Sequence, residues 1–460
     1  MALPGYPDSS SLSDELVLAL PDRGILIDRW ISYSFNNDFL TPTDAWHFET
    51  AGKNLSPAII DSLYCGARVQ LRINGHTQAS GFIDVVDTHY ERGVGTVYTI
   101  SGRDVFGPVV DSGADPRLYT FLPTMTLDQV IQQVFGQFGF TDPSQFVISN
   151  DANRTIQTGI KTVGAKGKPL KATKLAKQLQ PQPGEGMFQY VARFLHRFGV
   201  WCWPSADGSQ VIVSVPNYDS GNSFNLVRSA TGLTSNIIGG GVREDATDQP
   251  SAILATGTSY GDSNAKTVLK VILVNELTGL VVDQTSDSAE MVPIGNVLGL
   301  ISRYPEAKYI DPRSVFQGYL KTLGREDPIA RPMFLHDEES KNIDELKAFA
   351  YRELSLRQQR MWTAQYTVAG HTQNGAPWAV DTMVQVDDDE GRGLHGPMYV
   401  RGRTFEKSRQ GGTTTKLSLV LPHTLDLGSG FDNSVSGQVT IPTTTNVGTP
   451  QVGATIVPQS

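Results

Sequence analysis

Two stretches that lie far apart in this chain repeat one order of short strands and hairpins, and this repeat constrains the fold most strongly. Apolar residues alternate with polar ones in both stretches, and glycine-rich polar gaps separate them, which is typical of strands joined by hairpin turns. The spacings differ by only a few residues. The first stretch comprises residues 48–52, 69–71, 81–83, 93–96 and 97–100, and the second comprises residues 366–370, 384–386, 396–399, 411–413 and 417–420.

The repeat predicts a β-barrel or sandwich domain that occurs twice in the chain. One alternative stays open, because all-β segments resemble one another when turns require glycine and strands favour β-branched residues. If the duplication holds, three copies of the chain around an axis present six similar barrels. A trimer of this kind can sit on a sixfold ring.

The composition supports a folded, turn-rich protein. The chain has 45 Gly and 26 Pro among 460 residues, which is below the roughly 25–30% of Gly plus Pro that marks low-complexity chains. The net charge of −9 argues against a surface that coats DNA, since such a surface needs clustered Lys and Arg, but it is compatible with a pore through which DNA slides.

The chain also lacks the sequence signals of several other classes. Cys65 and Cys202 are too few for a disulfide framework and have no metal-site spacing. No apolar run is long enough to predict a membrane span, so we expect no stable membrane insertion. Residues 1–13 lack the pattern of a signal peptide, and we therefore expect synthesis in a cytoplasm.

Periodicity and composition divide the chain into five parts. Apolar stripes at 126–140 and 186–200 predict two helices, and Asn342 with Glu345 predicts the start of a third over 343–360. The fold class that we predict is mainly β with an α+β module and two related β-barrel domains. The parts are a first barrel at 1–115, the α+β module at 116–215, a discontinuous second barrel at 216–275 and 361–427, an insertion with a helix at 276–360, and an extended C-terminal arm at 428–460.

Signals of catalysis are weak. The eight His are scattered and form no His-Glu-x-x-His pair, and no Gly-x-Ser-x-Gly elbow is present. Residues 164–169 loosely resemble a phosphate loop, but Pro169 stands where the hydroxyl that binds magnesium is required. We therefore predict no catalytic residue, no cofactor and no metal site.

Two charged runs and one aromatic cluster are candidate interaction sites. The acidic run Asp387, Asp388, Asp389 and Glu390 does not have the spacing of a calcium loop, and an acidic hairpin turn fits it better. If the barrels surround a channel, these carboxylates face the lumen and repel DNA phosphate. The lysine run at 161–177 predicts a solvated loop, with docking to an acidic neighbour as the alternative. Trp201 and Trp203 are expected to fill a core or a subunit interface.

Several segments resemble the baseplate hub proteins of contractile phage tails, of the phage Mu tail-hub type. The resemblance covers most of residues 20–425, and its motifs are individually loose but occur in the same order. Two departures are residues 276–335, which exceed a minimal hub, and the Ser/Thr-rich C-terminal tail. The segments that carry the resemblance are 28–30, 48–52, 65–69, 80–84, 98–104, 109–112, 186–200, 207–211 and 368–378.

The resemblance implies a structural protein of the virion that is assembled in the host cytoplasm. It implies a homotrimeric ring that joins the sixfold tail tube, or a tube-initiator ring, to the threefold central spike. Other baseplate proteins would contact this ring, and DNA would pass through it without specific binding. For the C-terminal arm we expect strand addition to a neighbour through Phe431, Val439, Ile441 and Val447.

Two alternatives remain open at this point. The hub of a phage-derived contractile injection particle, such as a tail-like bacteriocin, performs the same task, so the sequence does not separate it from a phage hub. A spike-associated cell-wall hydrolase would need a pair of carboxylates in a cleft, and the chain has no compact extra domain to contain one.

Overall fold

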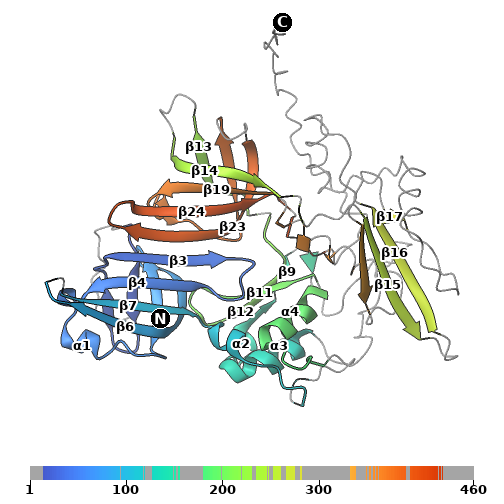
Figure 1. Cartoon of the computed structure of the whole chain (residues 1–460), viewed down its shortest axis with the longest axis horizontal. Coiled ribbons are helices and arrows are strands. Elements are labelled where there is room, and N and C mark those ends of the chain that lie inside the picture. The colour runs from blue at the N-terminus through green and yellow to red at the C-terminus, as the bar shows by residue number, and fades with distance from the viewer. Residues whose placement is uncertain are drawn as a thin grey trace, which may run out of the picture.

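The centre of the computed structural model is one 13-stranded sheet that contains strands from both halves of the chain (Figure 1). The structure describes residues 14–155, 180–281, 332–337 and 349–427, with short gaps inside these ranges. The strands of the first half are β1 (Val17–Leu20), β2 (Ile25–Ile27), β3 (Ser32–Asp38), β4 (Ala45–Ala51), β5 (Arg68–Ile73), β6 (His76–Glu91) and β7 (Gly95–Asp104). Those of the second half are β13 (Asn222–Arg228), β14 (Ile237–Glu244), β19 (Trp362–Ala369), β22 (Thr382–Asp388), β23 (Leu394–Ser408) and β24 (Gly412–Val420).

The two halves have the same strand order. Neighbouring strands run β3-β4-β7-β6-β5-β1 in the first half and β14-β19-β24-β23-β22-β13 in the second. All of these pairs are antiparallel except β13 with β22, which is parallel. The repeated stretches of the sequence therefore fold into corresponding strands.

The correspondence extends to single positions. Phe48 pairs with Ile100 in the first half, and Tyr366 pairs with Leu417 in the second. The long strands β6 and β23 each contain a β-bulge at the same place, where the register shifts between Ile83 and Val85 and between Val400 and Gly402. A bulge adds one unpaired residue and increases the local twist, so both long strands bend at equivalent points.

The structure corrects the expectation of two closed barrels. Within the residues described, no closed barrel is formed, and the halves are joined because β23 pairs with β3 over residues 402–407 and 33–38. The second part of β23 extends past the end of β22 and is free to pair with the first half. One hydrophobic cluster accordingly includes Phe48 and Ile100 from the first half with Tyr366 and Leu417 from the second.

The α+β module packs around its own core. Its elements are α2 (Gly107–Asp111), α3 (Leu127–Phe135), α4 (Met187–Arg197), β8 (Phe146–Ile148), β11 (Trp201–Pro204) and β12 (Val211–Ser214). Both helices predicted from apolar stripes are confirmed, and α3 is followed by a 3-10 turn that ends at Gly139 with a φ of 97°. Phe135, Tyr190 and Phe194 are fully buried between the helices and the small sheet.

A separate four-stranded sheet contains β15 (Ala252–Tyr260), β16 (Lys266–Val274), β17 (Leu280–Val281) and β18 (Pro332–Asp337). The first two strands were assigned by sequence to the second barrel, and the structure places them outside its sheet. Of the helix predicted over 343–360, five residues are described as helical, and the others lie outside the described residues. The remaining short elements are α1 (Pro57–Ile60), β9 (Asn150–Asp151), β10 (Arg154–Thr155), β20 (Thr372–Gln373) and β21 (Ala376–Pro377).

Candidate functional site

The contact between β3 and β23, called the inner seam below, joins the two halves of the sheet. Phe35 and Phe405 lie directly opposite in the register, with ring centroids 6.1 Å apart. Next to them, the Thr404 hydroxyl donates a hydrogen bond to Asn36 over 3.0 Å. The inner seam is thus a full antiparallel strand pair with an aromatic contact and a polar contact across it.

A buried histidine connects the inner seam to the start of the chain. The His371 ring is fully buried, with its Nε2 2.8 Å from the Tyr33 hydroxyl and its Nδ1 3.0 Å from the Thr415 hydroxyl. The Tyr33 oxygen accepts from the Leu16 amide, and the Thr415 hydroxyl donates to the Gly370 carbonyl. These partners make Tyr33 the donor to Nε2 and leave the proton on Nδ1.

Burial lowers the pKa of His371 to about 3, so its ring is neutral across the physiological range. Every polar atom of the ring has a protein partner, and the side chain has no exposed surface. A base must reach its substrate. His371 therefore acts as a structural link and not as a proton-transfer group.

Aromatic side chains form a junction between the sheet and the α+β module. Phe39, just after β3, lies with its ring centroid 5.4 Å from that of Trp201 and 4.9 Å from that of Trp203. Tyr399 of β23 lies 6.3 Å from Phe39, and the Trp201 indole donates to the Leu425 carbonyl over 3.1 Å. The Trp-Cys-Trp segment therefore serves a junction within one chain.

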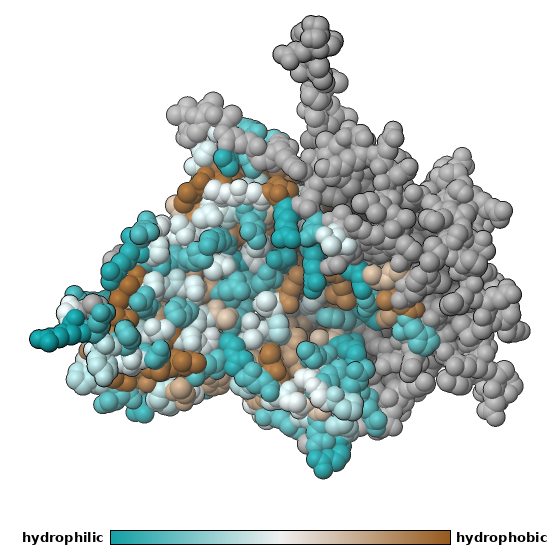
Figure 2. Space-filling view, viewed as in Figure 1, coloured by the Kyte–Doolittle hydropathy of each residue, from teal (hydrophilic) through white to brown (hydrophobic). Residues whose placement is uncertain are grey.

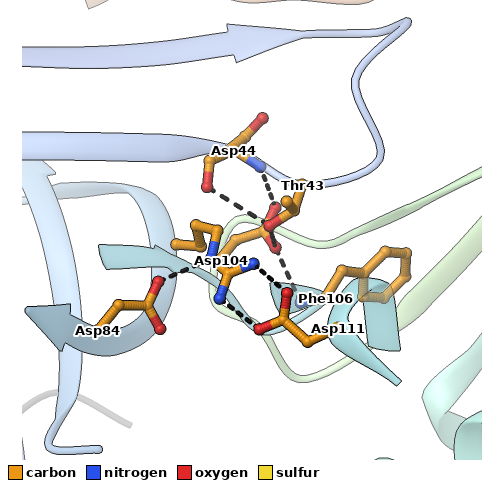
Figure 3. Close-up of polar contacts among 7 residues, drawn as sticks. Thr43, Asp44, Asp84, Asp104, Phe106 and Asp111 are labelled. Atoms are coloured by element: carbon orange, nitrogen blue, oxygen red, sulfur yellow. Dashed lines mark hydrogen bonds and ion pairs between the residues drawn. The ribbon is translucent and has the colours of Figure 1, made fainter. Parts of the chain in front are cut away.

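Two carboxylates lie at a second junction, where the first half of the large sheet meets α2 (Figure 3). Asp104, at the end of β7, is buried and accepts from the Asp44 amide over 2.8 Å, from the Thr43 hydroxyl over 2.6 Å and from the Phe106 amide over 2.8 Å. Asp44 accepts a hydrogen bond from the Asn37 side chain. The carboxylates therefore fix the turn into β4 and the entry into the module.

An arginine joins three elements at the same junction. The Arg103 guanidinium makes two hydrogen bonds to Asp111 of α2, of 2.7 and 2.6 Å, and its Nε donates to Asp84 of β6 over 2.7 Å. Figure 3 shows Asp84 and Asp111 on opposite sides of this junction. A planar guanidinium holds two carboxylates in fixed directions, so this contact orients α2 against the sheet.

The buried carboxylates give the junction a definite pH dependence. Burial raises the pKa of Asp104 to about 6, and burial together with the Asp104 charge raises the pKa of Asp44 well above its ordinary value. The folded chain then binds more protons than the unfolded chain between about pH 4 and 6. The contribution of this pair to stability therefore increases as the pH falls through that window.

We expect Asp44→Asn to stabilise the protein at pH 7, because it removes the like charge beside Asp104, although the loss of its attraction to the buried Arg403 guanidinium offsets part of the gain. The gain over the wild type should shrink toward pH 4, where the wild-type pair is protonated. Urea unfolding at pH 4, 5, 6 and 7 measures this difference. The contribution of His371 to stability has the opposite sign, since acid protonates its ring in the unfolded chain. This contribution is the same in the wild type and the variant, so it cancels in their difference.

Asp22→Asn, at an exposed carboxylate in the turn before β2, is the matched control for this pH series. It should leave the unfolding free energy unchanged within about 0.5 kcal/mol at every pH. An Asp44→Asn gain that is absent at pH 7, or that grows as the pH falls, would contradict the assignment.

Several strands of the large sheet, β2 and β13 among them, have a strand partner on one side only among the described residues, and two such edges expose large apolar side chains. The first is the part of β6 that follows its bulge, residues 84–91, which pairs with β7 only. The second is β14, which pairs with β19 only and ends the sheet. Val85 is 52% exposed and Tyr90 is 80% exposed on the first edge, and Ile238 is 62% exposed on the second. Figure 2 shows hydrophilic side chains at the tip of the β6–β7 hairpin, which projects at the left.

The acidic run occupies the end of β22 and the turn after it. Asp388 is buried and accepts a hydrogen bond from the Tyr366 hydroxyl over 2.8 Å, so its carboxylate is turned into the protein. Asp387 and Asp389 are exposed. The Nδ1 atom of His395 lies 3.4 Å from Oδ1 of Asp387, and its Nε2 atom lies 3.8 Å from Oδ1 of Asp389. Glu390 lies outside the described residues. Within the described part of the run, Asp387 and Asp389 are thus the exposed carboxylates, and that they line a channel stays a prediction.

Two other predicted sites lie outside the described residues. They are the C-terminal arm with Phe431, Val439, Ile441 and Val447, and the lysine run at 161–177. Both stay predictions from the sequence. Among the residues that the structure does describe, no group of acidic, His or Cys side chains could hold a metal ion, and no helix is long and apolar enough to cross a bilayer.

Sequence reasoning missed the residues that join the halves. Tyr33, His371 and Arg403 come from separate parts of the chain, and only the pairing of β3 with β23 brings them together. Asn374-Gly375 is an Asn-Gly hairpin signal, with φ values of 55° and 82°, and it could have located the β20–β21 turn next to His371.

Comparison with known proteins identifies the class of the first half. Residues 18–104 match the family model described as Mu phage baseplate assembly protein GpP-like, N-terminal. These residues are thus similar to a domain of a phage baseplate assembly protein. The match confirms the resemblance to Mu-type baseplate proteins, and the family described is structural, with no catalytic family indicated.

Solved structures extend the likeness to nearly the whole chain. A tail protein from Neisseria meningitidis MC58 is 20% identical with a TM-score of 0.64, over 90% of this chain and 99% of that one. The 43 kDa tail protein of prophage MuSo2 from Shewanella oneidensis is 18% identical with a TM-score of 0.59, over the same shares of the two chains. At these identities the likeness shows a common fold. No curated protein matches the chain by sequence.

Proposed function

We propose that this chain is the homotrimeric hub of a phage tail baseplate. In this role it joins the sixfold tail tube to the threefold spike and surrounds the channel for DNA. The match of residues 18–104 to a baseplate assembly family supports the proposal, as does the fold shared with two tail proteins.

One observation carries the symmetry argument. The two halves have the same strand order and a bulge at the same position of their long strand. A threefold arrangement of the chain therefore presents six similar half-sheets in alternation around its axis. A ring with this property can contact a sixfold partner on one side and a threefold partner on the other.

The electrostatic balance is compatible with a channel for DNA. The chain has a net charge of −9, and the exposed carboxylates Asp387 and Asp389 add negative charge at one hairpin. We propose that these two side chains face the lumen, where weak repulsion of phosphate prevents DNA from adhering.

The contacts between subunits of a permanent ring of this kind bury on the order of 2,000 Å² or more per pair of subunits.

Deletion of the gene for this chain in a host that produces the particles tests the proposal. We expect tail assembly to stop, with neither tubes nor spikes joined into complete particles, and a plasmid copy to restore them. Negative-stain electron microscopy of the lysates scores complete tails. Complete, infectious particles formed without the chain would overturn the proposed function.

A further inference from the structure

We propose that copies of this chain join edge to edge, with residues 85–91 of β6 pairing with residues 239–245 of the partner subunit. The partner is therefore a second copy of the same chain, and we call this contact the outer seam. The inference rests on the trimer proposed above and names the surface that closes it.

The inner seam provides the template for the outer one. In the second half, the part of β23 after its bulge pairs with β3, the first strand of the other half. The equivalent of that strand part in the first half is residues 85–91 of β6, and the equivalent of β3 in the second half is β14. Both equivalents lack a strand partner on that side among the described residues. The free edge of β6 in one copy can therefore pair with the free edge of β14 in another copy.

The equivalence fixes a register. In the inner seam, Thr404 lies opposite Asn36, Phe405 opposite Phe35, and Lys407 opposite Tyr33. We align β6 with β23 at their bulges, and β3 with β14 through the strands that they pair with, β4 and β19. This alignment transfers the positions of the inner seam to the outer seam. In that register Asp87 lies opposite Arg243 of the partner subunit, Thr88 opposite Val242 of the partner subunit, and Tyr90 opposite Gly240 of the partner subunit.

The charges in this register are complementary. Asp87 is exposed on β6, and the Arg243 side chain is 75% exposed on β14. Within one chain, Arg243 makes an ion pair of 2.6 Å with Asp245, which leaves donors of its guanidinium for a second carboxylate. Thr404 and Asn36 hydrogen-bond at the corresponding place of the inner seam.

The shapes are complementary as well. In the inner seam an aromatic ring, Tyr33, lies on the receiving strand. In the outer seam the aromatic ring is Tyr90 on β6, and the receiving strand has a run of three glycines, residues 239–241. Tyr90 is 80% exposed, so its ring would be covered by this contact. An exposed edge with apolar side chains is the kind of surface that pairs with another chain.

At the bulge the two seams differ. Arg401 makes a 3.1 Å ion pair with Asp38 in the inner seam, whereas the outer seam brings Asp84 toward Asp245 of the partner subunit. Asp84 is already paired with Arg103, and Asp245 with Arg243, so both carboxylates have cations within one chain. The two edges are different surfaces, so the contact is head to tail, and three such contacts form a closed ring when each rotates the chain by one third of a turn, as the trimer proposed above requires.

Cysteine cross-linking tests the register in the full chain. Asp87→Cys with Arg243→Cys, in a Cys65→Ser background, should give a disulfide-linked trimer on a non-reducing gel. Glu91→Cys with Arg243→Cys places the two thiols four residues out of register and should give little product. Equal cross-linking of both pairs, or none at 87 and 243 in a chain that is trimeric by mass, overturns the outer seam.

Charge reversal provides an independent readout. Asp87→Arg and Arg243→Asp alone should each raise the dissociation constant of the trimer about tenfold, and the double variant should restore it. Thermal unfolding shows whether each variant is folded. A trimer by mass whose stability is unaffected by either reversal contradicts the outer seam and leaves the hub role standing. A wild-type chain that forms no trimer, alone or in particles, contradicts both.

Discussion

Phe405→Ala should destabilise the chain by about 3–5 kcal/mol, the cost of emptying a large buried aromatic position. The Phe405 side chain has no exposed surface and packs against three partners in the inner seam. Its ring centroid lies 6.1 Å from that of Phe35, 4.6 Å from that of His371 and 4.6 Å from the Arg403 guanidinium carbon. Urea unfolding followed by tryptophan fluorescence measures the loss.

Two variants make the Phe405 result interpretable. Phe405→Leu keeps most of the apolar volume and should cost about 1.5 kcal/mol. Tyr64→Ala removes a ring that is 50% exposed and should change the unfolding free energy by less than about 0.5 kcal/mol. If Phe405→Ala behaved like Tyr64→Ala, the two halves would not share a core in solution.

Gly102→Ala is the second substitution for which we expect a large effect. Gly102 lies near the end of β7, paired with Trp46 of β4 on one side and Ile83 of β6 on the other. A Cβ at this position would meet the Phe82 carbonyl oxygen and the Trp46 ring. Because one obstacle is backbone, the strand must shift, and we expect a loss of about 3 kcal/mol in stability.

Gly136→Ala is the control for Gly102→Ala. Gly136 lies in the 3-10 turn after α3, where a Cβ meets nothing within 4 Å and the φ is not in the left-handed region. Its effect on the unfolding free energy should stay within about 0.5 kcal/mol. Equal effects of the two substitutions would show that β4, β6 and β7 pack more loosely than the structure indicates.

The repeat could be found in the sequence because its key positions are local. Residues 48–51 and 366–369 form corresponding strands in the register that the pattern predicted, and so do residues 69–71 and 384–386. Alternation and hairpin glycines are sufficient to mark these strands. The glycines of the two long strands aligned less well, since Gly81 and Gly396 lie two positions apart when the bulges are superimposed.

The joining of the halves could not be predicted from the same signals. Pairing between β3 and β23 links residues about 370 positions apart, and no local pattern specifies which distant strand fills an open edge. The expectation of two closed barrels failed for this reason. The link through His371 depends on that long-range arrangement and was missed with it.

A side-chain-resolution reconstruction of the assembled tail end tests the central claim most directly. We expect three copies of this chain in one ring, with the inner and outer seams alternating around the axis and six similar half-sheets facing the tube. A ring with another number of copies, or one in which residues 84–91 of β6 face solvent, would contradict the account.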